Sequence, residues 1–396
     1  MKILFLSVWY PYPADNGSKL RVDHLLRALA ARHEVTLLSF AFDTAAPHRS
    51  VGQREYCADI RTVACNPFER NRSSSLRRFF SREPVAMRAI PEMSALAQAT
   101  LSEQGFDLVI ASTTLMAVYA QQAPDTVKRV LEEHNSLTRM MWDRYRAQGS
   151  ALQRLRRWAS WQKTRRYEAR LFRGFDLITM VSEQDRATSL SGLPGFQGAV
   201  EVIPNGVDCA HNRPGLAAPQ PHALVYNGAL TYSANYDAMH YFLDEIYPLI
   251  RAQEPEVSLA ITGSTSGVDL AGLPLGAGAE TVGFVEDVRP LVAGAWAVVA
   301  PIRQGGGTRL KILEAMALGT PVVATSKAAE GLSVTSGRDI LIADGPDAFA
   351  ACVVQLLRDA ALREYLAGNA RQLVELEYDW QAIGQRFVDL IEEVGG

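Results

Sequence analysis

The chain has 396 residues, of which 48% are hydrophobic and 21% charged, with a formal net charge of −3. This length is too great for one typical hydrophobic core, so we expect two domains. The composition suits a globular α/β protein. We expect no nucleic-acid partner. The four cysteines are scattered and lack paired metal-ligand spacing, so we expect neither a zinc site nor disulfide bonds.

Hydropathy and charge differ along the chain. No apolar stretch reaches 18 residues, and the apolar run at residues 2–8 is too short to span a membrane and precedes no small-residue cleavage site. We therefore expect a cytoplasmic protein. Residues 1–208 carry a net charge of +7 and the remainder carries −10, so the two halves are electrostatically different bodies.

The first half opens with the pattern strand, loop, helix, strand, at residues 2–8, 9–21, 22–31 and 34–40. This order is typical of a doubly wound sheet, in which ligands collect beyond the carboxyl ends of the strands. The loop around Gly17 is therefore a candidate binding segment, although a glycine beside Asn16 is equally typical of an ordinary turn.

Further strands are predicted at residues 106–112 and 128–132, and proline-broken, basic residues 66–92 should form helices and loops over the sheet. His134 lies just beyond the second of these strands, where it could contact a substrate. A lone histidine is more often structural, so its position alone leaves both interpretations open.

Residues 139–173 form a basic, helix-forming segment with eleven Lys and Arg against two acids, and three tryptophans are interleaved. One interpretation is a surface helix whose Leu152, Leu155 and Ala159 pack on the sheet while the arginines are solvated. The other is a helix that binds an anionic membrane peripherally, on the inner face of the cytoplasmic membrane.

A domain boundary is predicted near residue 208. A strand-like segment at 175–182 is followed by the run 200–208, which contains the turn Pro204-Asn205-Gly206. Residues 209–222 are then rich in Pro, Gly and Ala, as in a linker. We therefore expect one domain at 1–208 and a second at 209–380.

The second half restarts the α/β pattern, with strands predicted at 223–227, 258–262 and 281–285 and a helix at 234–252. Gly228 follows the first strand and Gly263 the second. Each glycine alone is a weak signal, because a glycine after a strand usually marks a turn.

The most informative stretch is residues 301–323, PIRQGGGTRLKILEAMALGTPVV, which follows a strand-like run at 296–300. Three consecutive glycines, Gly305 to Gly307, lead into a helix with Thr308 as a plausible N-cap and Gly319 at its end. Glycines before a helix let backbone N–H groups converge at the positive end of the helix dipole, where a phosphate would fit.

Charged side chains sharpen this prediction. Arg309 and Lys311 fall in the first helical turn, where each cation is disfavoured by about 0.3–1 kcal/mol, so an anion is expected nearby. Glu314 is the acid one turn further on, and it can face the same site. The alternative is a glycine-rich turn with two solvated cations and a Glu314–Lys311 pair.

This segment resembles the donor-site motif of retaining family 4 glycosyltransferases of the GT-B fold, in the branch that reads GGGTRLKxLEAM. The resemblance implies two Rossmann-like doubly wound domains facing a cleft, with the acceptor bound by the first and a nucleotide-diphosphate sugar by the second. It also implies that Glu314 binds the ribose. The family's other glutamate, which contacts the transferred sugar, would fall on Gly306.

Other roles follow from the same resemblance. His134 would hydrogen-bond a sugar hydroxyl through its side chain or its backbone carbonyl, the segment IPNGVD would end the first domain, and helix 381–396 would pack back on that domain. The relatives' arginine and lysine after Gly228 are missing, so Arg309 and Lys311 would replace them as catalytic cations. The donor-binding residues implied are Gly17, Gly228, Gly263, Val285, Gly305, Gly306, Gly307, Thr308 and Leu310.

The expected reaction moves a sugar from a UDP- or GDP-sugar to a saccharide or lipid-linked acceptor of cell-surface polysaccharide biosynthesis, without a tightly bound cofactor. No Asp-x-Asp motif occurs, so we expect transfer without a metal ion. Retention without an obvious carboxylate nucleophile implies front-face attack, in which the departing phosphate accepts the proton of the incoming hydroxyl. Two alternatives stay open: a GT-B nucleotide-sugar epimerase, and a nucleotide-sugar-binding partner subunit with weak or no catalysis. A dinucleotide dehydrogenase is disfavoured, because residues 7–20 contain only Gly17 of a Gly-x-Gly-x-x-Gly fingerprint.

Overall fold

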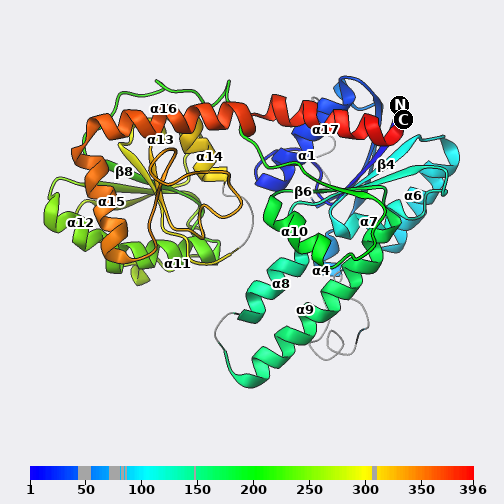
Figure 1. Cartoon of the computed structure of the whole chain (residues 1–396), viewed down its shortest axis with the longest axis horizontal. Coiled ribbons are helices and arrows are strands. Elements are labelled where there is room, and N and C mark those ends of the chain that lie inside the picture. The colour runs from blue at the N-terminus through cyan, green and yellow to red at the C-terminus, as the bar shows by residue number, and fades with distance from the viewer. Residues whose placement is uncertain (43–54, 71–80, 82–83, 85–86, 147–148, 306–309) are drawn as a thin grey trace. The chain divides into compact units, whose positions relative to one another are not determined.

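The computed structural model of the chain describes residues 1–42, 55–70, 81, 84, 87–146, 149–305 and 310–396 (Figure 1). These residues divide into two compact units. Unit 1 comprises Met1–Pro204 and Ile383–Gly396, and unit 2 comprises Asn205–Ala382. The division falls four residues before the boundary that we predicted at residue 208.

Unit 1 is built on a parallel sheet with the strand order β3-β2-β1-β4-β5-β6-β7. Its strands are β1 (Lys2–Ser7), β2 (Glu34–Ala41), β3 (Asp59–Ala64), β4 (Leu108–Ser112), β5 (Lys128–Glu132), β6 (Leu177–Met180) and β7 (Ala199–Val202). Its helices are α1 (Gly17–Ala30), α4 (Pro67–Arg70), α6 (Pro91–Glu103), α7 (Thr114–Ala120), α8 (Leu137–Arg146), α9 (Ala151–Leu171), the 3-10 turn η2 (Phe172–Gly174), α10 (Glu183–Ser191) and most of α17 (Trp380–Gly395).

The core of unit 1 lies on both faces of this sheet. Side chains from α6, α7 and α9 pack on the face that includes Leu4, Leu38 and Val109. Helix α17 packs against α1 so closely that a Cβ added at Gly384 would lie 2.8 Å from the Ala28 Cβ. Glycine at this position therefore allows close packing of the two helices.

Unit 2 is built on a second parallel sheet, with the order β10-β9-β8-β11-β12-β13. Its strands are β8 (Ala223–Asn227), β9 (Ser258–Thr262), β10 (Ala279–Gly283), β11 (Ala297–Ala300), β12 (Val322–Ala324) and β13 (Leu341–Ile342). Its helices are α11 (Ser233–Tyr241), the π-helical turn η3 (Phe242–Ile246), α12 (Tyr247–Gln253), the 3-10 turn η4 (Leu270–Gly272), α13 (Arg289–Gly294), α14 (Leu310–Ala317), α15 (Pro346–Arg358) and α16 (Ala360–Glu377).

Helices cover both faces of the unit 2 sheet. One hydrophobic cluster joins the sheet to η3, α12 and α15, and the other joins it to α13, α14 and α16 (Figure 1). Two parallel sheets, each covered by helices, confirm the predicted doubly wound α/β class.

Several predicted boundaries were wrong. Helix α1 begins at Gly17, five residues earlier than predicted, because the Asn16 side chain accepts a hydrogen bond from the Lys19 N–H and caps the helix. Gly17 therefore lies in a helical turn and not in a loop. The single helix predicted at 234–252 is interrupted by η3, and the basic segment 139–173 forms two helices.

Candidate functional site

The strand order of the unit 2 sheet changes direction at β8: β9 and β10 lie on one side of it, and β11, β12 and β13 lie on the other. Open α/β sheets bind ligands beyond the carboxyl ends of their strands at such a switch point. Three glycines that we predicted to bind the donor lie at this edge: Gly228 directly after β8, Gly263 directly after β9, and Gly305 in the loop after β11. All three glycines therefore lie beyond the carboxyl ends of the strands, where open α/β sheets bind ligands.

Gly263 is required by the backbone. Its φ is +118°, a conformation that side chains with a Cβ rarely adopt. An added Cβ would also lie only 2.5 Å from the carbonyl carbon of Gly228. The chain after β9 thus runs against the chain after β8 with no space for a side chain.

Lys311 reaches the same place from the first turn of α14. Its ammonium lies 3.2 Å from the Asn235 Oδ1 and 4.0 Å from the centroid of the Tyr226 ring. A Cβ added at Gly228 would lie 2.3 Å from the Lys311 Nζ, so the ammonium lies against the backbone after β8. Gly228 and Lys311, 83 positions apart in the sequence, are brought together.

Glu314 lies one turn further along α14 and points toward the end of β8. Its Oε2 accepts a hydrogen bond of 3.2 Å from the Asn227 Nδ2. Burial raises the pKa of Glu314 above its usual range, while the charge of Lys311 and the bond from Asn227 oppose this effect. The buried Asn227 Oδ1 has no hydrogen-bond partner among the described residues. A half-satisfied polar pair of this kind is typical of a site that completes its contacts with a ligand.

The other predicted donor residues are placed less tightly. Gly305 has a φ of +95°, and Leu310 is the first residue of α14. Val285 lies two residues beyond β10. Gly306, Gly307, Thr308 and Arg309 fall outside the described residues, so the predicted N-cap and one of the two predicted cations have no structural description. Gly319, predicted to end the helix, has a φ of +75°, in agreement with a left-handed cap.

Arg303 is a cation at this edge that the sequence reasoning missed. It follows β11 by three residues, pairs with the Asp237 carboxylate at 3.0 Å and lies with its guanidinium 4.1 Å from the centroid of the Tyr241 ring. A basic residue in the loop between a buried strand and three glycines was the available signal.

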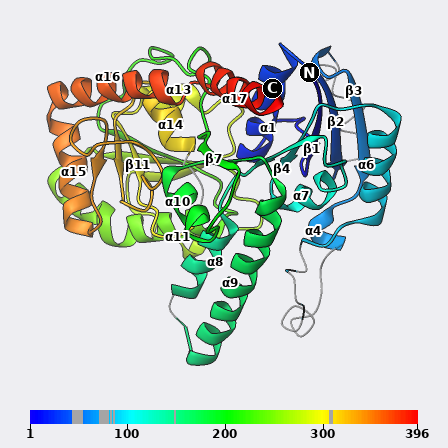
Figure 2. The same cartoon turned by 45° about the vertical axis from the view of Figure 1, so that its right-hand side comes forward.

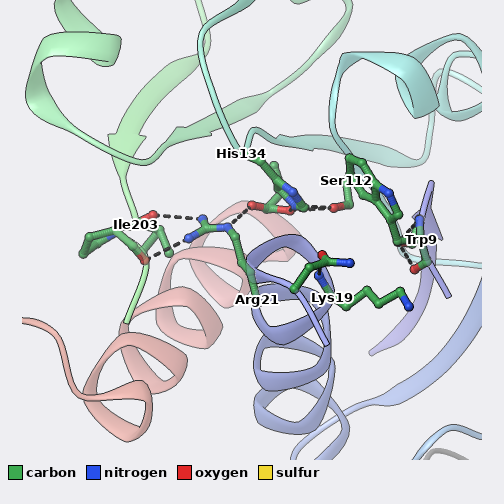
Figure 3. Close-up of polar contacts among 10 residues, drawn as sticks. Trp9, Lys19, Arg21, Ser112, His134 and Ile203 are labelled. Atoms are coloured by element: carbon green, nitrogen blue, oxygen red, sulfur yellow. Dashed lines mark hydrogen bonds and ion pairs between the residues drawn. The ribbon is translucent and has the colours of Figure 1, made fainter. Parts of the chain in front are cut away.

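In unit 1, His134 belongs to a buried polar network (Figure 3). Its Nε2 lies 2.9 Å from the Ser112 Oγ and 3.1 Å from the Glu132 Oε2, and its ring stacks on Trp9 at a centroid distance of 5.6 Å. The Ser112 hydroxyl donates to the same carboxylate oxygen at 2.7 Å. The position of His134 after β5 agrees with the prediction, but these partners were not foreseen.

Arg21 holds the opposite side of this network. Its Nε donates to the Glu132 Oε1 at 2.5 Å, and its two terminal nitrogens donate to the carbonyls of Ile203 and Pro204 at 2.9 and 2.8 Å (Figure 3). Burial by itself would raise the pKa of Glu132, but the charges of Arg21 and His134 outweigh it and hold the pKa well below its usual range. Glu132 is therefore an ionised, fully paired carboxylate, which fixes one edge of the His134 ring.

Two more buried carboxyls lie at the base of the helical hairpin that follows. Burial raises the pKa of Glu133 well above its usual range, and the Thr114 hydroxyl donates to its carboxyl group. Burial, helped by the charge of Asp185, raises the pKa of Glu168 to about 7 against hydrogen bonds from Thr138. The Glu133 contact joins the end of β5 to α7, and the Glu168 contact joins α9 to α8.

Helices α8 and α9 form a hairpin that extends away from the sheet of unit 1 (Figure 2). Trp142 packs on Trp161 with ring centroids 4.7 Å apart and joins the two helices. At the start of α9, however, Leu152, Leu155 and Trp158 are exposed by 58%, 59% and 43%. Of the two interpretations of this segment, the one in which Leu152 and Leu155 pack on the sheet is therefore wrong, because the hairpin extends away from the sheet.

Two searches of the described residues bear on other kinds of site. None of the helices in the described ranges is long and apolar enough to cross a bilayer. Within the same ranges, His, Cys, Asp and Glu side chains form no group of three or more that could hold a metal ion.

Comparisons with known proteins agree with this architecture. Residues 16–211 match the family model described as "Glycosyltransferase Family 4", and residues 221–359 match "Glycosyl transferases group 1". A protein of Klebsiella pneumoniae named "Uncharacterized 44.6 kDa protein in cps region" is 19% identical over 96% of both chains. A GDP-mannose-dependent monoacylated alpha-(1-6)-phosphatidylinositol monomannoside mannosyltransferase of Corynebacterium glutamicum is 24% identical, over 55% of this chain and 62% of its own.

Solved structures of similar fold cover nearly the whole chain. Sucrose-phosphate synthase of Thermosynechococcus elongatus has a TM-score of 0.73 at 19% identity, over 99% of this chain and 98% of its own. Anabaena Alr3699/HepE, solved in complex with UDP and glucose, has a TM-score of 0.68 at 18% identity, over 99% of this chain and 100% of its own. Two sheets of GT-B type and two family models that lie one after the other along the chain lead to one assignment: the protein is a glycosyltransferase of the GT-B fold and belongs to the family 4 type.

Proposed function

We propose that this protein transfers a glycosyl group, with retention of anomeric configuration, from a UDP- or GDP-sugar to a hydroxyl of a saccharide or lipid-linked saccharide. The observation that carries the proposal is the convergence of Gly228, Gly263, Lys311 and Glu314 at the switch point of the unit 2 sheet. Two close backbone segments, an ammonium and a buried carboxylate are the groups that a nucleoside diphosphate requires.

In this proposal the charge of the leaving diphosphate falls on Lys311, Arg309 and the N–H groups of the glycine loop. Glu314 accepts hydrogen bonds from the ribose hydroxyls, and His134 of unit 1 contacts the transferred sugar. The remaining donor-binding residues proposed are Gly17, Val285, Gly305, Gly306, Gly307, Thr308 and Leu310. Cations and N–H dipoles that are fixed before the reaction stabilise the developing phosphate charge without reorganisation.

The proposed chemistry breaks the bond between the anomeric carbon and the β-phosphate oxygen and forms a bond from that carbon to the acceptor oxygen on the same face. The acceptor hydroxyl gives its proton to the departing phosphate. This route needs no enzymic carboxylate as a nucleophile. Glu132, held as a salt with Arg21 and covered by protein, is unsuited to that role.

The relatives support the donor and acceptor classes in this proposal. One solved neighbour binds UDP and glucose, and one curated relative uses GDP-mannose and acts on a phosphatidylinositol mannoside. Both bases therefore stay in the proposal. A lipid-linked acceptor, as an intermediate of cell-surface polysaccharide, would place the protein on the inner face of the cytoplasmic membrane.

The α8–α9 hairpin is the proposed membrane contact. Exposed Leu152, Leu155 and Trp158 alternate on α9 with the exposed arginines Arg154 and Arg156. Apolar side chains that insert between lipids, flanked by cations for anionic headgroups, make up an interfacial helix. This composition supports peripheral binding to an anionic bilayer by residues 139–173.

A thermal-shift titration with UDP, GDP, ADP and dTDP tests the donor class. A nucleotide present at 100 times its dissociation constant should stabilise the protein by about 2.7 kcal/mol. Incubation of the matching nucleotide sugars with saccharide and lipid-linked acceptors, followed by NMR of the product, then gives the anomeric configuration. Inverted product would overturn the retaining mechanism, and stabilisation by none of the four nucleotides would overturn the proposed donor class.

A further inference from the structure

The Lys311 side chain contacts β8 and the segment that follows it. The segment from Gly228 to Asp237 contains no lysine or arginine. The ammonium of Lys311, from α14, nevertheless reaches this segment and lies 3.2 Å from the Asn235 Oδ1. A cation is thus supplied to a loop that has none of its own.

Glycine at position 228 is explained by this contact. Gly228 does not have a positive φ, so its backbone conformation does not require glycine. A Cβ there would lie 2.3 Å from the Lys311 Nζ and 3.0 Å from the Asn235 Nδ2, well inside van der Waals contact. The missing side chain is what leaves room for the ammonium.

Asn235 connects β8, the segment after it and α14 through three hydrogen bonds. Its Oδ1 accepts hydrogen bonds from the Tyr226 hydroxyl at 2.7 Å and from Lys311, and its Nδ2 donates to the Ala229 carbonyl at 2.8 Å. The orientation of the amide follows from these partners, because a reversed amide would direct its NH₂ group at both the ammonium and the tyrosine hydroxyl. The cap of α11 does not depend on this side chain, since its N-cap residue is Tyr232.

The Tyr226 ring also contacts the ammonium. It is fully buried in β8, and the face of its ring lies 4.0 Å from the Lys311 Nζ. An aromatic face attracts an ammonium electrostatically but does not neutralise it. A tyrosine ring and an amide oxygen therefore both contact the ammonium and fix its position.

We propose that Gly228, Tyr226 and Asn235 form a cradle that positions the Lys311 ammonium for the diphosphate of the donor, with Asn235 as the positioning residue. This inference rests on the proposed function, in which Lys311 binds the diphosphate. It adds that the binding strength of Lys311 depends on an asparagine from another helix. A lysine that only compensates the charge of Glu314 would not need this cradle.

A double-mutant cycle tests the proposal. The variants are Asn235→Ala, Lys311→Ala and the combination, and the ligands, measured by calorimetry, are inorganic pyrophosphate and whichever nucleoside diphosphate stabilises the wild type most. Lys311→Ala should weaken both at least tenfold and Asn235→Ala about fivefold. In the Lys311→Ala background, Asn235→Ala should have less than a twofold effect. Asn369→Ala, on α16 of the same unit, is the matched control and should bind as the wild type does.

Two more variants separate positioning from folding. Tyr226→Phe keeps the ring and removes only the hydroxyl, so it should lose less than threefold. Asn235→Asp keeps the shape but gives Lys311 a carboxylate, so it should weaken diphosphate binding more than Asn235→Ala while the protein stays folded by melting temperature.

The outcomes are distinguishable. Equal effects of Asn235→Ala in both backgrounds would overturn the cradle, as would wild-type affinity in Asn235→Ala. Coupling observed with pyrophosphate while no nucleotide binds would support the cradle and reject the proposed donor. Absence of binding by pyrophosphate and all nucleotides would reject both.

Discussion

Arg21 and Glu132 form an ion pair with a distance of 2.5 Å between Nε and Oε1, and both side chains are buried. The pair joins α1 to the end of β5, 111 positions apart in the sequence. Each partner has further hydrogen bonds, from Arg21 to the carbonyls of Ile203 and Pro204 and from Ser112 to Glu132. Because the polar groups of the pair are satisfied, it can fix the position of His134 without leaving an unpaired charge in the core.

Removal of Arg21 should be strongly destabilising. Arg21→Met leaves the Glu132 carboxylate buried without its main counter-charge, and breaking a buried pair in this way costs about 3–5 kcal/mol. The free energy of unfolding from urea denaturation measures the loss. Arg27→Met is the control on the same helix. The Arg27 side chain is 53% exposed, and its partner Asp23 keeps the hydrogen bond that the Tyr56 hydroxyl donates, so the loss should be only about 1 kcal/mol. Similar losses in the two variants would show that the buried pair has no special role.

Glu314 should discriminate between ligands that contain ribose and ligands that do not. Glu314→Gln removes a charged hydrogen-bond acceptor, which is worth about 1.5–3 kcal/mol, so UDP or GDP should bind at least tenfold more weakly. Inorganic pyrophosphate should bind at least as well, because a negative charge near the phosphates is removed. Calorimetric titration of both ligands measures this. Equal weakening of both would instead make Glu314 a structural partner of the site.

The buried Glu168 should make stability depend on pH. Burial raises its pKa to about 7 in the folded protein, against 4.5 for an unperturbed glutamate, so the folded state binds the proton more tightly than the unfolded state. The contribution of Glu168 to the free energy of unfolding should therefore be greatest below pH 4.5 and fall as the pH rises to about 7, by at most about 1.4 kcal/mol per pH unit. Glu133 has a pKa shift in the same direction and adds to the effect.

Glu168→Gln should flatten this dependence, because glutamine stays neutral and its carbonyl can still accept the bond that the Thr138 N–H donates. The variant should melt above the wild type at pH 8 and lose this advantage at pH 5. Glu364→Gln, at an exposed position of α16, is the control and should follow the wild type at both pH values. A constant difference between Glu168→Gln and the wild type would contradict the buried-acid explanation.

The hairpin should bind anionic vesicles. Arg154 and Arg156 each contribute about 1 kcal/mol near an anionic surface, so changing both to Glu should weaken binding to phosphatidylglycerol vesicles by at least tenfold. Vesicle sedimentation at low and high salt measures this. The matched control reverses Arg213 and Arg386, two exposed arginines outside the hairpin, and should bind nearly as the wild type does. Equal binding to anionic and neutral vesicles at low salt would reject the membrane contact and favour a soluble acceptor.

The apolar part of the same surface has its own test. Leu155→Ser with Trp158→Ser removes exposed side chains that pack poorly on the protein, so melting temperature should hold while vesicle binding falls. A large drop in melting temperature would mean that these side chains stabilise the hairpin itself.

Local patterns determined much of the donor half from the sequence. The strand that ends at Ala300, the glycines after it, Glu314 on the following helix and the left-handed Gly319 are all encoded within about twenty residues. Propensity, periodicity and helix stops act over this range, so they could be predicted. The same reasoning was wrong at Gly17, where one capping side chain extended the helix backwards.

Only the tertiary structure decided which distant groups meet. Lys311 contacts Tyr226 and Asn235, Arg21 pairs with Glu132, and Leu155 faces solvent. All three results depend on the strand order and on where each helix leaves its sheet. Leu152, Leu155 and Ala159 recur at helical spacing in the sequence whether α9 lies on the sheet or extends from it. Sequence periodicity specifies which side of a helix is apolar, but burial depends on whether another element covers that side, and this is fixed only when the chain is packed.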